Sequence, residues 1–373
     1  MSEPRWVSER AVAMGRLCDG GVRRPTTVRS VGFRAALIPA FRDSRAVWFG
    51  VAWLLVGCGG GGTVATTSTP TQPPVTFSPL VTPIPQPAQR QEPSLPVPIE
   101  EAGAAAAGGN LYVIGGFNAA GASLDSVYVF DGSTWRAGPR LPLPVDHPSA
   151  ATLDGQVYLA GGHSNGRDSA RVFRLDGDHW TELAALHFAR GGHALIGAQG
   201  KLFAIGGNTS RGNVAQAETY DPAANAWTVL PSLPDPRNHV MAFVAGSEVC
   251  VAGGRSPTTA RVDCFDVATG AWARLPDLPQ ASSGGGGTAF LGGDVVVMGG
   301  QDASETRIID QLTRRAPGGG WSSGERMLFP RHGFELAIFA GRAWACGGGS
   351  APGLHPVATC TSIAGPSGAP RGR

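Results

Sequence analysis

The chain has 373 residues, of which 55 are glycine, 30 are proline and 42% are apolar, with a formal net charge of +2. This composition is typical of a loop-rich all-β protein. Nine of the 30 basic residues but only four of the 28 acidic ones lie within residues 1–57, so the remainder carries a net charge of −3. The folded part therefore lacks the basic excess that a nucleic-acid partner would favour.

Residues 1–57 are interpreted as an arginine-rich n-region and a lipoprotein signal peptide. The twelve apolar residues AVWFGVAWLLVG at 46–57 are too few to span a bilayer but suit the core of a signal peptide. Leu55-Val56-Gly57-Cys58 resembles the lipobox of bacterial lipoproteins, which implies cleavage before Cys58 and lipidation of its thiol. An ordinary signal peptide or a buried helix would contain the same apolar run.

Residues 58–91 are expected to form a flexible linker behind the lipidated cysteine. The segment is rich in threonine, proline, serine and glutamine, and it has too few apolar side chains to fold by itself. Its prolines favour semi-extended backbone, so the linker would hold the following domain away from a membrane.

From residue 92 to residue 364 one pattern repeats six times. Each unit has an apolar run that ends in a glycine pair, then a polar loop and a second apolar run, and in the first five units an aspartate, a turn and a tryptophan follow. The glycine pairs begin at Gly115, Gly161, Gly206, Gly253, Gly299 and Gly347. The tryptophans are Trp135, Trp180, Trp227, Trp272 and Trp321. In the third unit the pattern predicts strands at 193–199, 201–207, 217–221 and 226–230.

A fixed period of 45 to 48 residues indicates a repeat architecture. The glycine pair, the aspartate and the spaced tryptophan resemble the kelch repeat, which implies an all-β, six-bladed propeller with four-stranded blades. Residues 365–373 are expected to be a disordered tail. The resemblance predicts the fold more strongly than the function, because the family includes binding scaffolds and some enzymes.

The first and last repeats predict how the ring closes. Residues 93–116 align without a gap on 231–254, so the chain starts the fold at the end of a fourth strand. The last unit has a third strand near 357–363 but no tryptophan after it. We therefore expect residues near 81–92 to supply the missing strand, as an outermost strand that tolerates proline.

Four cysteines remain after Cys18 and Cys58, and both pairs among them are separated by 14 residues. Cys250 and Cys346 lie in second strands, and Cys264 and Cys360 lie in the third strands of the same units. Neighbouring antiparallel strands bring such positions within disulfide range, so Cys250–Cys264 and Cys346–Cys360 are the expected bridges in an exported protein. Buried free thiols are the alternative.

Polar residues recur just before each predicted first strand, on the face where the loops after the glycine pairs also lie. The candidate ligand-binding residues on this face are Arg190, His193, Arg237, His239, Arg331, His332, His147, Glu101 and Arg255. One interpretation is a partly cationic mouth of a central channel, suited to acidic or sugar-like ligands, because arginine matches carboxylates. The other is that the arginines are ordinary repeat residues that bond backbone carbonyls.

We expect neither a metal nor another cofactor, because side chains on different blades should lie too far apart to share one ion. No GxSxG, HExxH or phosphate-loop motif is present. The hypothesis is therefore a monomeric lipoprotein, exported and anchored at the cell envelope, whose propeller binds a protein or a glycan. The alternative is an enzyme resembling the kelch-fold sialic-acid mutarotases, with Arg190, Arg237, Arg331 and either Glu335 or Glu101 acting on a sugar acid.

Overall fold

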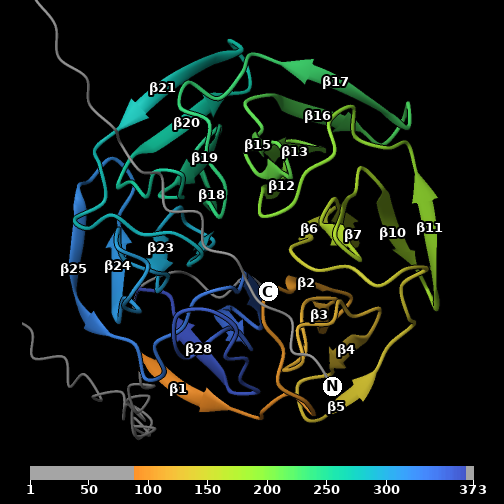
Figure 1. Ribbon diagram of the computed structural model, residues 1–373. Helices are drawn as coiled ribbons and strands as arrows, with labels where there is room; N and C mark the ends of the chain where they lie inside the picture. Colours follow the sequence, from red (N-terminus) through yellow and green to blue (C-terminus); the bar gives the residue numbers. More distant parts are fainter. Residues whose placement is uncertain (1–87, 367–373) are drawn as a thin grey trace, which may run out of the picture. The chain divides into compact units, whose positions relative to one another are not determined.

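Each predicted repeat forms one four-stranded antiparallel sheet, and six such sheets surround a central axis in the computed structural model (Figure 1). The structure describes residues 88–366, which all belong to the compact unit Leu80–Arg373. The predicted all-β six-bladed propeller is confirmed. The predicted signal peptide, the linker up to residue 87 and the tail from residue 367 lie outside the described residues.

In every blade the strands lie in order from the axis outward, and we call them A to D. Blade 1 contains β2 (Gly103–Ala107), β3 (Asn110–Ile114), β4 (Val127–Phe130) and β5 (Trp135–Ala137). Blade 2 contains β6 (Ser149–Leu153), β7 (Gln156–Ala160), β10 (Val172–Asp176) and β11 (His179–Leu183). Blade 3 contains β12 (Ala194–Ala198), β13 (Lys201–Ile205), β16 (Ala217–Asp221) and β17 (Ala226–Leu230).

The remaining blades follow the same plan. Blade 4 contains β18 (Met241–Ala245), β19 (Glu248–Ala252), β20 (Val262–Asp266) and β21 (Ala271–Leu275). Blade 5 contains β22 (Gly286–Ala289), β23 (Val295–Met298), β24 (Gln311–Arg315) and β25 (Trp321–Arg326). Blade 6 contains β26 (Leu336–Phe339), β27 (Arg342–Cys346), β28 (Cys360–Ala364) and β1 (Gln89–Glu92).

Two small hairpins complete the described elements. They are β8 (His163–Ser164) with β9 (Arg167–Asp168), and β14 (Asn208–Thr209) with β15 (Gly212–Asn213). Both lie in loops between a B strand and a C strand. Within residues 88–366 we find no helix that is both long and apolar enough to cross a bilayer.

Strand β1 closes the ring from the amino-terminal side. It pairs antiparallel with β28, so that Gln89 lies opposite Ile363 and Glu92 lies opposite Cys360 (Figure 1). This is the outermost position of blade 6, where the incomplete last repeat lacks a strand of its own. Of the segment expected to fill that place, residues 89–92 form the strand, while residues 81–87 are outside the described part.

The hydrophobic core consists of six clusters, each lying between two neighbouring blades. One of them joins Ile114 and Val127 of blade 1 to Leu159 and Phe173 of blade 2. A single four-stranded sheet cannot bury both of its faces, so each blade depends on its neighbours for burial.

The repeated tryptophans link each of blades 1 to 5 to the blade before it. The indole Nε1 of Trp180 donates to the Pro139 carbonyl at 2.9 Å, and that of Trp227 donates to the Ala184 carbonyl at 2.9 Å. The tryptophans of blades 1, 4 and 5 make the same kind of bond. The repeat therefore needs tryptophan for both its apolar area and its single donor.

Both expected disulfides are present. Cys250 lies directly opposite Cys264 in the β19–β20 register, and Cys346 lies directly opposite Cys360 in the β27–β28 register. The two Cα–Cα distances are 4.0 Å and 4.1 Å. Each bridge therefore fastens the B strand of one blade to its C strand.

We expect each bridge to stabilise the fold by about 3 kcal/mol, because each closes a loop of about 15 residues in the unfolded chain. Urea unfolding with and without dithiothreitol measures this contribution. The double variant Cys250→Ala/Cys264→Ala should lose about half of the sensitivity to reductant. An unfolding midpoint that does not respond to reductant would contradict the prediction.

Candidate functional site

A ring of six residues surrounds the axis where the A strands begin. The ring residues are Glu101, His147, Gly192, His239, Gly284 and Gly333, one from each blade, and all have positive φ between 50° and 69°. Each backbone N–H donates to the carbonyl of the ring residue before it, at 2.6 to 3.0 Å, and Glu101 closes the circle by donating to Gly333. The ring therefore requires left-handed backbone in every blade.

Glycine adopts this conformation without a steric penalty, whereas a residue with a side chain loses roughly 1–2 kcal/mol. Three blades have glycine at the ring position, and the other three carry Glu101, His147 and His239. Non-glycine residues held in this region are often retained for function. The three side chains therefore mark one end of the axis as the candidate site.

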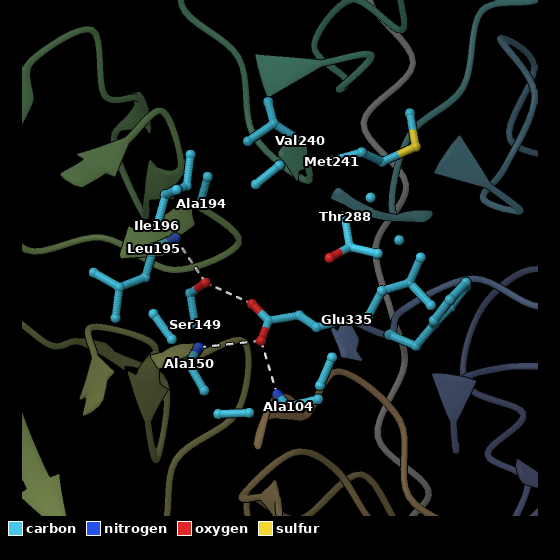
Figure 2. A pocket seen from close by; sticks show the side chains of 18 of the residues that line it. Ala104, Ser149, Ala150, Ala194, Leu195, Ile196, Val240, Met241, Thr288 and Glu335 are labelled. Carbon is cyan, nitrogen blue, oxygen red and sulfur yellow. Dashed lines mark hydrogen bonds between the residues drawn. The ribbon is translucent and has the colours of Figure 1, made fainter. Parts of the chain in front are cut away.

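A central cavity of about 450 Å³ extends along the axis from this ring. The A strands of all six blades line it, and most of the lining side chains are small or apolar. The polar exceptions are Glu101, His147, His193 and His239 at the ring end and Glu335, which lies directly before β26. Figure 2 shows its carboxylate reaching the first residues of blades 1 and 2.

The Glu335 carboxylate accepts three hydrogen bonds from these two blades. Ser149 Oγ donates to Oε1 at 2.5 Å, and the backbone N–H groups of Ala104 and Ala150 donate to Oε2 at 2.8 and 3.1 Å. Ser149 Oγ in turn accepts from the Leu195 N–H in blade 3 at 2.9 Å. Glu335 thus connects four blades around the cavity. Burial raises its pKa to about 7 despite these donors.

The three predicted arginines do not line the cavity. Arg190, Arg237 and Arg331 are at most 1% exposed and point into the blades. Each donates to the carbonyl of the first glycine of a pair, Gly206, Gly253 or Gly347, at 2.6 to 3.0 Å. The interpretation as ligand-binding residues is wrong for them, and the alternative, repeat residues that bond backbone carbonyls, describes their contacts.

Two of these arginines are also paired with buried carboxylates. Arg190 contacts Glu218 at 2.8 Å and Arg237 contacts Asp263 at 2.9 Å. Arg331 instead bonds the Thr359 carbonyl at 2.7 Å, and burial lowers its pKa to about 10. The mutarotase-like alternative thus loses its proposed arginines, and no arginine lines the cavity within the described residues.

His193 and His332 also fall outside the ring. His193 follows the ring residue of blade 3, is 4% exposed, and packs against the glycine pairs of blades 2 and 3 at Gly161 and Gly207. Burial, and then Arg190, lower its pKa well below the usual value. His332 precedes Gly333, and its Nε2 lies 3.0 Å from the Ala351 carbonyl and 3.1 Å from Glu100 Oε1.

The structure brings the other predicted residues together at the ring. His147 Nε2 lies 3.7 Å from Glu101 Oε2, and His239 Nε2 lies 3.8 Å from Glu101 Oε1. The imidazole centroids of His147 and His239 are 5.0 Å apart. Arg255 completes the group, since its Nη2 lies 2.9 Å from His239 Nε2.

The two histidines differ electrostatically although they are neighbours. Burial opposes the charged form of His147, but Glu101 and Asp146 outweigh burial and raise its pKa. Burial lowers the pKa of His239 well below its usual value, and Arg255 adds to this effect. At neutral pH, His239 is therefore an uncharged imidazole.

The sequence analysis missed the residues that directly precede the ring. Asp146 Oδ1 bonds His147 Nδ1 at 2.7 Å, and Asn238 Oδ1 bonds His239 Nδ1. Glu100 is 2% exposed, and burial together with the neighbouring Glu101 raises its pKa to about 8. The only signal for these residues was their position one residue before each ring residue.

We predict that Glu335 makes stability fall as the pH rises from about 4.5 to about 7. Its folded-state pKa lies above the unfolded value of 4.5, so the folded protein keeps the proton in this window while the unfolded chain loses it. The stabilisation is complete below pH 4.5 and is lost as the pH approaches 7. Glu335→Gln should remove this slope, which amounts to roughly 3 kcal/mol. Chemical unfolding of both proteins between pH 5 and 8 measures it, and parallel curves would contradict the prediction.

Comparison with known proteins places these features in a family context. The family model for the kelch motif matches residues 101–142, 146–187 and 189–234. Kelch-like protein 25 of Xenopus tropicalis is 36% identical over 90 residues, which are 23% of this chain and 15% of that protein. Alpha-scruin of Limulus polyphemus is 34% identical over 89 residues, which are 24% of this chain and 10% of that protein.

These curated relatives are matched over less than a fifth of their own length. Among solved structures, one titled "Structure of YjhT" superposes with a TM-score of 0.64 at 16% identity, and the match covers 74% of this chain and 97% of that one. At this identity the likeness concerns the fold alone. The chain therefore contains kelch motifs in its first three blades, and its described residues fold as a six-bladed β-propeller.

Proposed function

We propose that this chain is an exported, lipid-anchored kelch protein whose propeller binds a protein or glycan partner on the face that contains the ring. Kelch propellers are a protein-binding type of module, and no motif for catalysis occurs in the sequence. The observation that carries the proposal is the arrangement of the B–C loops. All six project from the ring face, because every B strand ends there with its glycine pair.

We call the outer part of this face the loop face, formed by residues 117–124, 163–169, 208–213, 255–259, 301–308 and 349–357. Arg167 and Arg211 are exposed at the tips of two neighbouring loops, and neither has an ion-pair partner among the described residues. Free guanidinium groups suit carboxylate, sulfate or phosphate groups on a partner surface. The expected partner is therefore an anionic protein surface or an acidic glycan.

The disulfides support the export part of the proposal. Structural disulfides persist in oxidising compartments and are rare where thiols are kept reduced. Two of them in one propeller agree with the apolar segment 46–57 and the lipobox-like Cys58. The anchor itself would follow from acylation at Cys58, followed by the linker to the propeller.

We predict that charge reversal on the loop face abolishes partner binding. Arg167→Glu/Arg211→Glu should weaken binding at least tenfold, because it replaces two free cations with anions. The test is an array of acidic glycans, together with cross-linking of the chain to envelope proteins and binding assays with each purified candidate. Asp178→Lys is the matched control, since Asp178 is fully exposed in a C–D turn on the opposite face.

If Asp178→Lys weakens partner binding as strongly as Arg167→Glu/Arg211→Glu does, the assignment of binding to the loop face is contradicted. If no glycan binds the wild type or its variants and no partner is cross-linked, the binding function as a whole is contradicted.

We also predict that the mature chain begins at an acylated Cys58. Mass spectrometry of the amino-terminal peptide from a bacterial host should give a fragment that starts at Cys58 and carries the acyl mass. Cys58→Ser should accumulate with residues 46–57 still attached, whereas Cys18→Ser should be processed normally. A wild-type amino terminus without acyl groups, or normal processing of Cys58→Ser, would exclude the anchor.

A further inference from the structure

Three of the ring residues have the side chains that proteins use to bind transition metals. The ring needs left-handed backbone in all six blades, and blades 3, 5 and 6 meet this need with glycine. The other blades place Glu101, His147 and His239 there. A carboxylate and two imidazoles are a common ligand set for zinc and related divalent ions.

The donor atoms of these three side chains converge. One oxygen or nitrogen from each lies within 4.8 Å of the others. Two ligands of a tetrahedral zinc ion, with bonds near 2.1 Å, are about 3.4 Å apart. The Glu101 oxygens lie 3.7 Å from His147 Nε2 and 3.8 Å from His239 Nε2, so only small side-chain shifts separate this arrangement from coordination.

The sequence analysis expected no metal because side chains on different blades should lie too far apart to share one ion. The donor distances at the ring remove that reason. Neighbouring blades are far apart at their outer strands. At the ring, however, the backbone of each blade bonds directly to the next, so their side chains meet over the axis.

Both imidazoles are already oriented as metal ligands. The Nδ1 of His147 bonds the Asp146 carboxylate at 2.7 Å, and the Nδ1 of His239 bonds the Asn238 side-chain oxygen. In the neutral form of each imidazole, this bond places the proton on Nδ1 and leaves the lone pair on Nε2, the nitrogen that lies near the other ring side chains. Metal-bound histidines in proteins are generally held by such a second hydrogen bond.

Arg255 occupies the same lone pair of His239. Its Nη2 lies 2.9 Å from His239 Nε2, while its Nη1 lies 3.6 Å from Glu305 Oε2. Arg255 is partly exposed, so it is able to keep the Glu305 contact after leaving His239. It would compete with a cation for this nitrogen.

We propose that Glu101, His147 and His239 form a binding site for one divalent transition-metal ion such as Zn²⁺. Three protein ligands leave at least one coordination position for water or for an anionic group from the cavity or the loop face. Another group of possible ligands, Glu100, Glu101 and His332, shares Glu101 but requires His332 to give up its contact with the Ala351 carbonyl. The site does not depend on the proposed partner or on the anchor.

The test measures Zn²⁺ affinity of the full-length chain after removal of metal, by competition with a chromophoric chelator at pH 7.5. Wild type should bind one equivalent more than the triple variant Glu101→Gly/His147→Gly/His239→Gly. Each single glycine variant should weaken this binding at least a hundredfold. Glycine is chosen because it occupies the equivalent position in three blades, so these variants should unfold at a temperature equal to or above that of wild type.

Further variants separate ligation from folding. Asp146→Asn should weaken Zn²⁺ binding about 10- to 100-fold by loosening His147. Arg255→Gln should instead strengthen binding several-fold, a change that a purely structural role of the ring would not produce. His179→Ala, in a histidine on outer strand β11, should bind as wild type does.

Equal Zn²⁺ binding by wild type and the folded triple variant would overturn the proposal. So would single glycine variants that bind with wild-type affinity.

Discussion

Hydrogen bonds between neighbouring blades hold this propeller together at one end of its axis. One circle runs through the six ring residues. A second circle lies beside it, in which the N–H of the second glycine of each pair donates to a carbonyl of the next blade, at 2.8 to 3.0 Å. A side chain on the first glycine of a pair would collide with the next blade, as one on Gly161 would with the Arg190 carbonyl and His193 of blade 3. The glycine pairs are therefore needed where blades meet, and the six pairs correspond to the six blades.

The sequence was sufficient to predict the blades, because the constraints that shape them are local. Alternating strands, glycine pairs and tryptophans recur at one spacing, and each has one structural use in every blade. Strand β1 was also predictable, since a missing fourth strand in a closed ring has only one place to go. The disulfides followed from the same register, because residues 14 apart lie opposite each other across a short loop.

The site was only partly predictable. The direction of a side chain and its contacts with residues of other blades do not follow from the local sequence. An arginine two residues before the ring can point to solvent or into the blade. The arginine points into the blade because it donates to the buried carbonyl of the first glycine, which would cost free energy if it stayed unpaired. Counting 14 residues back from each glycine pair found Glu101, His147 and His239. In blades 3 and 6 the same count gives the ring glycines Gly192 and Gly333, so His193 and His332 lie one position beside the ring.

The closing strand also bears on how an anchored propeller would carry load. The linker of the proposed lipoprotein leads directly into β1, so tension on the anchor would act first on the pairing of β1 with β28. Glu92 lies opposite Cys360 there, and the bridge to Cys346 fastens β28 to β27. Gln89 additionally bonds the Arg326 carbonyl and the Leu328 N–H in blade 5. The disulfide in blade 6 thus holds β28, the strand with which β1 pairs to close the ring. This gives a physical reason for the place of the disulfide in this blade.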